Sequence, residues 1–279
     1  MAKVVGPIKY HGGKSYLAPK IHAMAERVKY VHRAIAFAGG LGEFWNWHCE
    51  GVSESVNDVD KRIVNFYRVI QRKESFEEFA RIVSAVPLSR DEWQMAKDLD
   101  DAGATQYEGV NSAAWFFVLA RQSYAGRQKE FSVPSRTRTR RGMQEAASAW
   151  MSAVDGLFDV HRRLSRVMVD RMDFEVFCQR NDGKDTLHYL DPPYLDETRA
   201  AKDVYRHERG EADGSSREFH ARVLRVVNEL TGKVILSGYP SEMYDGMLKG
   251  WRCERHSVSL SSASGQKKAR KLECLWANF

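Results

Sequence analysis

Four consecutive residues, Asp191-Pro192-Pro193-Tyr194, combine side chains and backbone groups that could do chemistry. Two adjacent prolines fix the torsion φ and restrict the preceding residue, so the carbonyls of Asp191 and Pro192 point in set directions. Neither proline has an N–H group, so hydrogen-bond acceptors dominate this turn. A carboxylate beside a rigid carbonyl is a good receptor for an NH2 group, which carries two donors. Tyr194 adds a flat face on which a heteroaromatic ring can stack.

The segment directly before this turn is apolar, and it predicts a buried strand over Thr186–Leu190. In α/β folds, ligands bind beyond the carboxyl ends of strands, so the position suits a binding site. The alternative is a tight turn capped by an aspartate, with a tyrosine packed in the core. That alternative is the weaker one for D-P-P-Y placed after an apolar strand.

Other short apolar runs predict the rest of a parallel sheet: Arg33–Ala38, Gly51–Val56, Val167–Val169 and Lys233–Ser237. The helices expected beside them are Ser15–Val28, Lys61–Gln71 and Phe219–Leu230. Strands that alternate with helices are typical of βαβ units. Two final segments, Trp251–Leu260 and Leu272–Phe279, could pair as antiparallel strands.

The middle of the chain has a different pattern. Residues 74–124 and 143–164 show helical spacing, and a polar, basic, loop-like segment, Tyr124–Gly142, joins them. The simplest layout is an α/β domain formed by residues 1–72 and 165–279, interrupted by a mostly helical insertion over residues 73–164.

The composition is that of an ordinary globular protein, because 43% hydrophobic and 29% charged residues exclude a disordered chain. Four scattered cysteines without a C-x-x-C pair argue against a zinc ribbon or a disulfide framework and favour a reducing, cytoplasmic setting. No apolar run approaches the roughly 20 residues of a membrane span, and residues 1–10 lack a secretory signal. The histidines show no metal-ligand spacing such as H-E-x-x-H, so no metal is expected.

Positive charge is concentrated between residues 121 and 141, where seven basic residues stand against one acidic residue, Glu130. The seven are Arg121, Arg127, Lys129, Arg136, Arg138, Arg140 and Arg141. The excess equals the net charge of the whole chain, +6. Interleaved Ser, Thr and Gln suit contact with nucleic-acid phosphates, although in isolation a solvated basic loop is the better explanation. A second basic run, Lys267–Lys271, could reach phosphates or form a hairpin tip.

Two further features lie at the ends of the first two predicted strands. Gly39 and Gly40 allow a sharp turn and a close approach to a ligand, although a pair of glycines is most often only a turn. Asp58 could accept hydrogen bonds from ribose hydroxyls or could cap the following helix. G-G-K-S (Gly12–Ser15) lacks the first glycine of a phosphate-binding P-loop, since Ile8 stands there, so an ATPase is not expected.

Taken together, these segments resemble the D12 class, or Dam-like, DNA adenine-N6 methyltransferases. H-Y-L-D-P-P-Y resembles the catalytic motif of enzymes that methylate exocyclic nitrogens. The other similar segments occur in the family's order: K-Y-H-G-G-K (Lys9–Lys14), F-A-G-G (Phe37–Gly40), N-D-V-D (Asn57–Asp60), R-Q-S-Y-A-G-R and E-F-S-V-P in the insertion, D-F-E (Asp173–Glu175), V-I-L-S-G-Y (Val234–Tyr239) and E-C-L-W-A-N (Glu273–Asn278). One departure is that Ile35 and Ala36 stand where family members often have an acidic residue.

The resemblance implies a Rossmann-like methyltransferase fold that uses S-adenosyl-L-methionine, with the insertion recognising the DNA target. It implies catalytic roles for Asp191, Pro192, Pro193 and Tyr194. The cofactor-binding residues that it implies are Tyr10, Lys14, Asp58 and Asp191. The glycine turn and the neighbouring aromatic residues add Phe37, Gly39, Gly40 and Phe174 to the expected cofactor site. Lys14 would pair with the methionine carboxylate, and Phe174 would lie against the cofactor adenine. The seven basic residues of the insertion would contact double-stranded DNA.

The predicted reaction is therefore methylation of N6 of an adenine flipped out of the duplex, in a bacterium or a phage-infected cell. Two alternatives stay open: methylation of cytosine N4, and a catalytically silent DNA-binding regulator on the same fold. A cognate restriction endonuclease, the recognition sequence and the oligomeric state are also left open.

Overall fold

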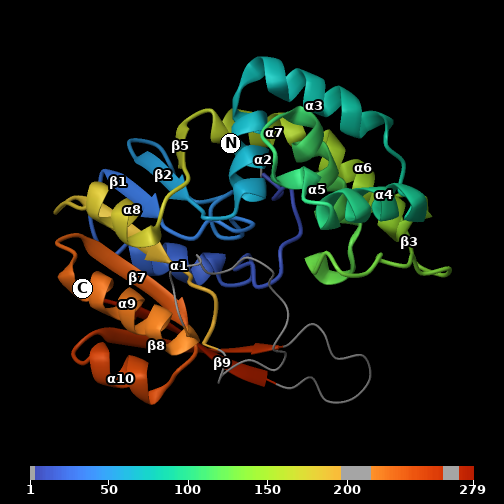
Figure 1. The fold of residues 1–279 in the computed structure, drawn as a ribbon. Helices are drawn as coiled ribbons and strands as arrows, with labels where there is room; N and C mark the ends of the chain where they lie inside the picture. Colours follow the sequence, from blue (N-terminus) through green and yellow to red (C-terminus); the bar gives the residue numbers. More distant parts are fainter. Residues whose placement is uncertain (1–3, 196–214, 260–269) are drawn as a thin grey trace. The chain divides into compact units, whose positions relative to one another are not determined.

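The computed structural model describes residues 4–195, 215–259 and 270–279, which form two compact units (Figure 1). Unit 1 comprises residues 1–18, 39–48 and 60–169, and unit 2 comprises residues 19–38, 49–59 and 170–279. The boundaries predicted at residues 72 and 165 divide the chain by function, into a catalytic domain and a target-recognition insertion. The two compact units divide it by packing, so the functional division stays a prediction.

Unit 2 is built on a central, mostly parallel sheet with the strand order β5-β2-β1-β6-β7-β9-β8. β1 is parallel to β2 and β6, β6 is parallel to β7, and β9 is antiparallel to β7 and β8. The strands are β1 (His32–Ile35), β2 (Ser53–Asn57), β5 (Val167–Asp170, whose last residue belongs to unit 2), β6 (Thr186–Leu190), β7 (Lys233–Gly238), β8 (Arg252–Ser259) and β9 (Arg270–Ala277). The predicted mixed α/β architecture and the predicted final antiparallel pair are confirmed.

The helices of unit 2 pack an apolar core against this sheet. They are α1 (Ala18–Ala25), α8 (Phe174–Arg180), α9 (Ser216–Glu229) and α10 (Glu242–Met247). A capping box between Ser215 and Glu218 starts α9, which buries Phe219 and Val223 in the same cluster as Leu190 of β6. Every residue of β6 is buried, as expected for a central strand with both faces covered.

Unit 1 is mostly helical, as predicted for the middle of the chain. Its elements are α2 (Lys61–Gln71), α3 (Lys73–Ala85), α4 (Arg90–Asp101), η1 (Ala104–Gln106), α5 (Val110–Gln122), η2 (Tyr124–Gly126), β3 (Thr139–Arg140), β4 (Met143–Gln144), α6 (Glu145–Asp155) and α7 (Leu157–Leu164). Phe66 of α2 packs on Phe79 of α3 and on Phe116 and Phe117 of α5, with ring centroids 5.8 to 5.9 Å apart. Burial of these aromatic faces joins α2, α3 and α5.

Some predicted boundaries differ from the structure. α1 begins at Ala18 instead of Ser15, so that Pro19 lies in the first turn, where its missing N–H costs no helical hydrogen bond. β1 ends at Ile35 because the chain then turns toward β2, where the Ala38 N–H donates to Asn57. The predicted basic loop ends in the β3–β4 hairpin, whose second strand, β4, begins directly after the loop. No helix in the described ranges is both long enough and apolar enough to span a bilayer.

Candidate active site

The D-P-P-Y segment directly follows the buried central strand β6, as predicted. Pro192 is buried, whereas Asp191, Pro193 and Tyr194 are half-buried, so the turn keeps open surface on three of its four residues. Ile35 of β1 lies beside Tyr189 of β6 in the parallel register. The segments that leave β1 and β6 therefore emerge at the same edge of the sheet.

The carboxylate of Asp191 is held by a residue of the neighbouring strand. The hydroxyl of Ser237 on β7 donates to Asp191 Oδ1 at 2.6 Å. Ser237 is fully buried and also accepts a longer bond from the Tyr189 hydroxyl at 3.4 Å. Because its donor is buried on a core strand, the position of Asp191 Oδ1 is set by the sheet itself.

Tyr194 is held in a similar way, by a residue far away in the sequence. Its hydroxyl donates to Glu273 Oε1 of β9, and Glu273 is fully buried. Its ring centroid lies 4.3 Å from that of Tyr239. Burial first, and then the charges of Glu273 and Asp191, raise the pKa of Tyr239 to about 12, so this neighbour stays neutral.

Sequence reasoning assigned no role to Ser237, Tyr239 or Glu273. The signals were present, because Ser237 and Tyr239 lie in V-I-L-S-G-Y and Glu273 begins E-C-L-W-A-N. Nothing local in those segments shows which side chain faces the D-P-P-Y turn.

The side chain of Asn57, the last residue of β2, forms hydrogen bonds with two other segments at this edge of the sheet, at Ala36 and Met172. Its side-chain amide donates to the carbonyls of Ala36 at 3.1 Å and Met172 at 3.0 Å, and it accepts from the Met172 N–H at 2.9 Å. Asn57 is buried, so these bonds are shielded from water. The predicted cofactor residues Phe37 and Asp58 each follow one of the joined residues directly.

Asp58 is half-buried, and its N–H donates to Asp170 of β5 at 3.4 Å. The helix-capping alternative for Asp58 is wrong. The N-cap of α2 is Asp60, whose side chain accepts from the Arg62 N–H at 2.8 Å. The other acidic residue of N-D-V-D thus does the capping, and the ribose role of Asp58 stays a prediction.

The two predicted aromatic ligands differ in exposure. Phe174 begins α8 and is only 4% exposed, whereas Phe37, with its ring centroid 5.4 Å away, is half-buried. The guanidinium of Arg222 lies over the Phe174 ring, 4.5 Å from its centroid. In this structure Phe174 is a core residue, and Phe37 has the more open ring.

In unit 1, the N-terminal motif packs tightly against the glycine turn. Gly39 has a φ of +46°, which confirms the predicted sharp turn. A Cβ on Gly40 would lie 2.6 Å from the Cβ of Tyr10, so this glycine is needed for the approach of Tyr10. Lys14 is 2% exposed, and its ammonium group donates to the Gly12 carbonyl at 3.0 Å.

The seven predicted DNA-contacting residues fall into two groups. Arg121 and Arg127 are half-buried, and the other five are exposed. Arg121 donates to the Ala149 carbonyl at 3.0 Å, and burial lowers its pKa to about 10. Arg141 and Gly142, with φ of +55° and +73°, form the two-residue turn of the β3–β4 hairpin, as favoured by hairpin twist. Of the second basic run, residues 267–269 lie outside the described residues.

A family model described as D12 class N6 adenine-specific DNA methyltransferase matches residues 10–259 of the 279. The chain belongs to this family. A search of curated proteins found no match. The E-C-L-W-A-N segment lies beyond the matched range, so the family match does not bear on Glu273.

Membership of this methyltransferase family confirms the predicted enzyme class and the predicted reaction, methylation of adenine N6 in DNA. It favours this reaction over the cytosine-N4 and silent-regulator alternatives. Among the residues that the structure describes, no group of three or more His, Cys, Asp or Glu side chains is arranged to hold a metal ion.

Proposed function

We propose that this methyltransferase transfers the methyl group of S-adenosyl-L-methionine to N6 of an adenine flipped out of double-stranded DNA. The observation that carries the proposal is the D-P-P-Y turn. Its two functional side chains, Asp191 and Tyr194, are each held by a fully buried partner, Ser237 and Glu273. Fixed acceptors and a fixed ring are what a weakly nucleophilic aromatic amine requires.

The lone pair of adenine N6 is delocalised into the ring, so the amine must be made more nucleophilic by its surroundings. The Asp191 carboxylate and the Pro192 carbonyl would each accept one N–H, which favours a pyramidal nitrogen. When bound, the cofactor would supply an electrophilic methyl group, which would leave its positively charged sulfur as it bonds to N6. The amine would then lose one proton to water, and the Asp191 carboxylate that accepts its N–H would assist this loss.

The donor set fits such a cofactor. The half-buried carboxylate of Asp58 suits ribose hydroxyls, and the Lys14 ammonium suits the amino-acid carboxylate. Gly39 and Gly40, with Tyr10 packed on them, would bring backbone groups close to the ligand. We assign the contact with the cofactor adenine to Phe37 and give buried Phe174 a supporting role behind it.

A base inside a duplex cannot reach the Asp191 carboxylate, so the target adenine would be extruded and stacked on Tyr194. We propose that residues 73–164 form the target-recognition insertion and bind the DNA. Its exposed cations, Lys129, Arg136, Arg138, Arg140 and Arg141, would contact phosphates, with Arg121 and Arg127 behind them.

Transfer of a radiolabelled methyl group from S-adenosyl-L-methionine to duplex DNA tests the proposal. Digestion to nucleosides then identifies the modified base. The expected product is N6-methyl-2′-deoxyadenosine. Label in N4-methylcytosine, or no incorporation by a protein that binds both substrates, would overturn it.

A further inference from the structure

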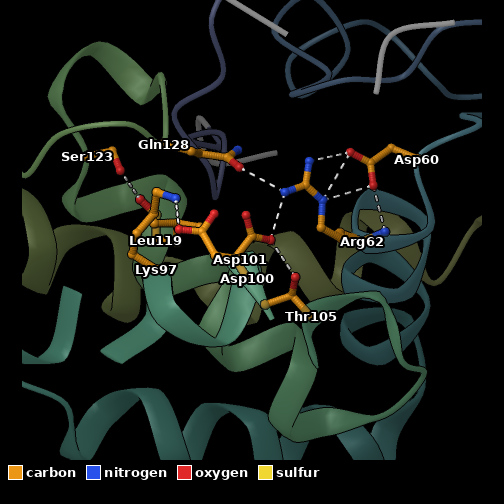
Figure 2. A network of polar contacts seen from close by, with 9 residues as sticks. All are labelled: Asp60, Arg62, Lys97, Asp100, Asp101, Thr105, Leu119, Ser123 and Gln128. Atoms are coloured by element: carbon orange, nitrogen blue, oxygen red, sulfur yellow. Dashed lines mark hydrogen bonds and ion pairs between the residues drawn. The ribbon is translucent and has the colours of Figure 1, made fainter. Parts of the chain in front are cut away.

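A buried arginine connects three parts of unit 1 that are distant in the sequence (Figure 2). Arg62, in the first turn of α2, donates to Asp60 Oδ2 at 2.8 Å, to Asp100 Oδ1 at 2.9 Å and to Gln128 Oε1 at 3.3 Å. Its side chain is 8% exposed, and those of Asp60 and Asp100 are equally shielded. The hydroxyl of Thr105 also donates to Asp100 Oδ1.

The three partners of Arg62 come from segments with different proposed tasks. Asp60 ends the N-D-V-D motif, two residues after the proposed ribose ligand Asp58. Asp100 lies on α4, in the helical framework. Gln128 lies between Arg127 and Lys129, both proposed DNA contacts. One guanidinium thus bonds a cofactor motif and the DNA-binding segment simultaneously.

The backbone conformation of Gln128 is unfavourable by itself, so the hydrogen bond from Arg62 helps to maintain it. Gln128 has a φ of +58°, a left-handed conformation that non-glycine residues adopt at some cost. Nearby, Gly126 meets the N-terminal motif, because a Cβ there would lie 2.6 Å from the Lys9 carbonyl oxygen. The start of the basic segment (residues 121–142) is therefore connected to two motifs with proposed cofactor contacts, through Gln128 and Arg62 to N-D-V-D and through Gly126 to K-Y-H-G-G-K.

We propose that Arg62 is a positioning residue that holds Gln128 and thereby couples DNA binding by the basic segment to cofactor binding beside Asp60. This inference rests on the proposed function. A ligand that orders one end of the network lowers the cost of ordering the other end, and such coupling is reciprocal between the two ligands. Arg62 itself contacts neither ligand.

The test measures DNA affinity with and without saturating S-adenosylhomocysteine, using a fluorescent pool of random-sequence 30-base-pair duplexes. For the unaltered protein we expect the cofactor product to tighten DNA binding by at least about fivefold. Gln128→Ala should reduce that factor below about twofold, with an unchanged affinity for S-adenosylhomocysteine alone. Arg62→Lys should lie between them, because an ammonium keeps the charge but cannot match the guanidinium fork.

Gln94→Ala is the matched control, because Gln94 lies on α4 and its side chain bonds only the nearby Asp98 at the surface among the described contacts. It should keep the full coupling. Equal weakening of DNA binding by Gln128→Ala with and without S-adenosylhomocysteine would make Gln128 a simple DNA contact and overturn the inference. Full coupling in Gln128→Ala, or none in the unaltered protein, would also overturn it. Failure to bind either ligand at all would instead overturn the proposed function.

Discussion

The D-P-P-Y turn and the basic segment of residues 121–142 differ in how their functional side chains are surrounded. Asp191 and Tyr194 bond to buried side chains 46 and 79 residues away in the sequence. Most cations of the basic segment are exposed instead, and one of them, Arg141, lies at the tip of a two-residue hairpin turn.

This difference follows from what each region has to do. Methyl transfer needs reacting atoms at fixed distances, so a small displacement of Asp191 would be costly. Phosphates repeat along DNA, so the basic segment needs charge at the surface more than one fixed geometry. Substitutions should therefore act sharply in the first region and gradually in the second.

The largest effect should come from Asp191→Ala. Loss of the fixed acceptor for the adenine amine should lower kcat by about a thousandfold or more. The affinity for S-adenosylhomocysteine, measured by calorimetry, should fall much less, because the other proposed ligands remain. Methylation at the original rate would refute the role of Asp191.

A smaller, salt-dependent effect should follow from replacing Arg138, Arg140 and Arg141 together by alanine. If each cation contacts one phosphate, the slope of log K against log salt should flatten by about 2.7, and affinity near 0.1 M salt should fall by up to about a hundredfold. Fluorescence anisotropy across a salt series measures both quantities.

The matched control for this triple variant replaces Arg180, Lys184 and Lys249 by alanine, three exposed cations outside residues 73–164, so the change in net charge is the same. Its salt slope should stay near that of the unaltered protein. An equal loss in both triples would mean that overall charge, and not the basic segment, attracts the DNA.

Much of the fold could be read from the sequence because its signals are local. β6 was predicted with its observed bounds, since an apolar run ends at Asp191-Pro192. α2 was also predicted with its observed bounds, because its apolar spacing is regular. The short hairpin at the end of the basic segment was missed, since T-R-R-G-M lacks the usual apolar alternation of strands.

The candidate site was predictable only in part. The D-P-P-Y turn was found, but which aspartate of N-D-V-D caps α2 depends on where β2 ends. That end is set by Asn57, whose partner Met172 lies 115 residues away. Ser237 and Glu273 were missed for the same reason, since the sheet and not the local sequence brings them to the turn.

Glu273→Gln should have a moderate effect that isolates the support of Tyr194. A neutral acceptor forms a weaker hydrogen bond than a carboxylate, so kcat should fall by about fivefold. In a double-mutant cycle, Tyr194→Phe should remove most of this effect, because the bond is then already lost. Glu254→Gln on neighbouring β8 is the control. Additive losses in the cycle would show that Glu273 acts on something other than Tyr194.

The smallest effect on activity, and a specific one on stability, concerns His188 on the strand that carries the D-P-P-Y turn. Burial lowers the pKa of His188 to about 4, although the nearby Asp182 carboxylate opposes the shift. In the unfolded chain its pKa is about 6.5, so the unfolded state binds the proton first as the pH falls. The contribution of neutral His188 to the free energy of unfolding is thus fully present above about pH 6.5. It is lost toward pH 4, by at most about 1.4 kcal/mol per pH unit. Urea unfolding between pH 7.5 and 5 should show a flatter pH dependence for His188→Gln than for the unaltered protein. An unaltered slope in His188→Gln would mean that this histidine is not kept neutral by the sheet.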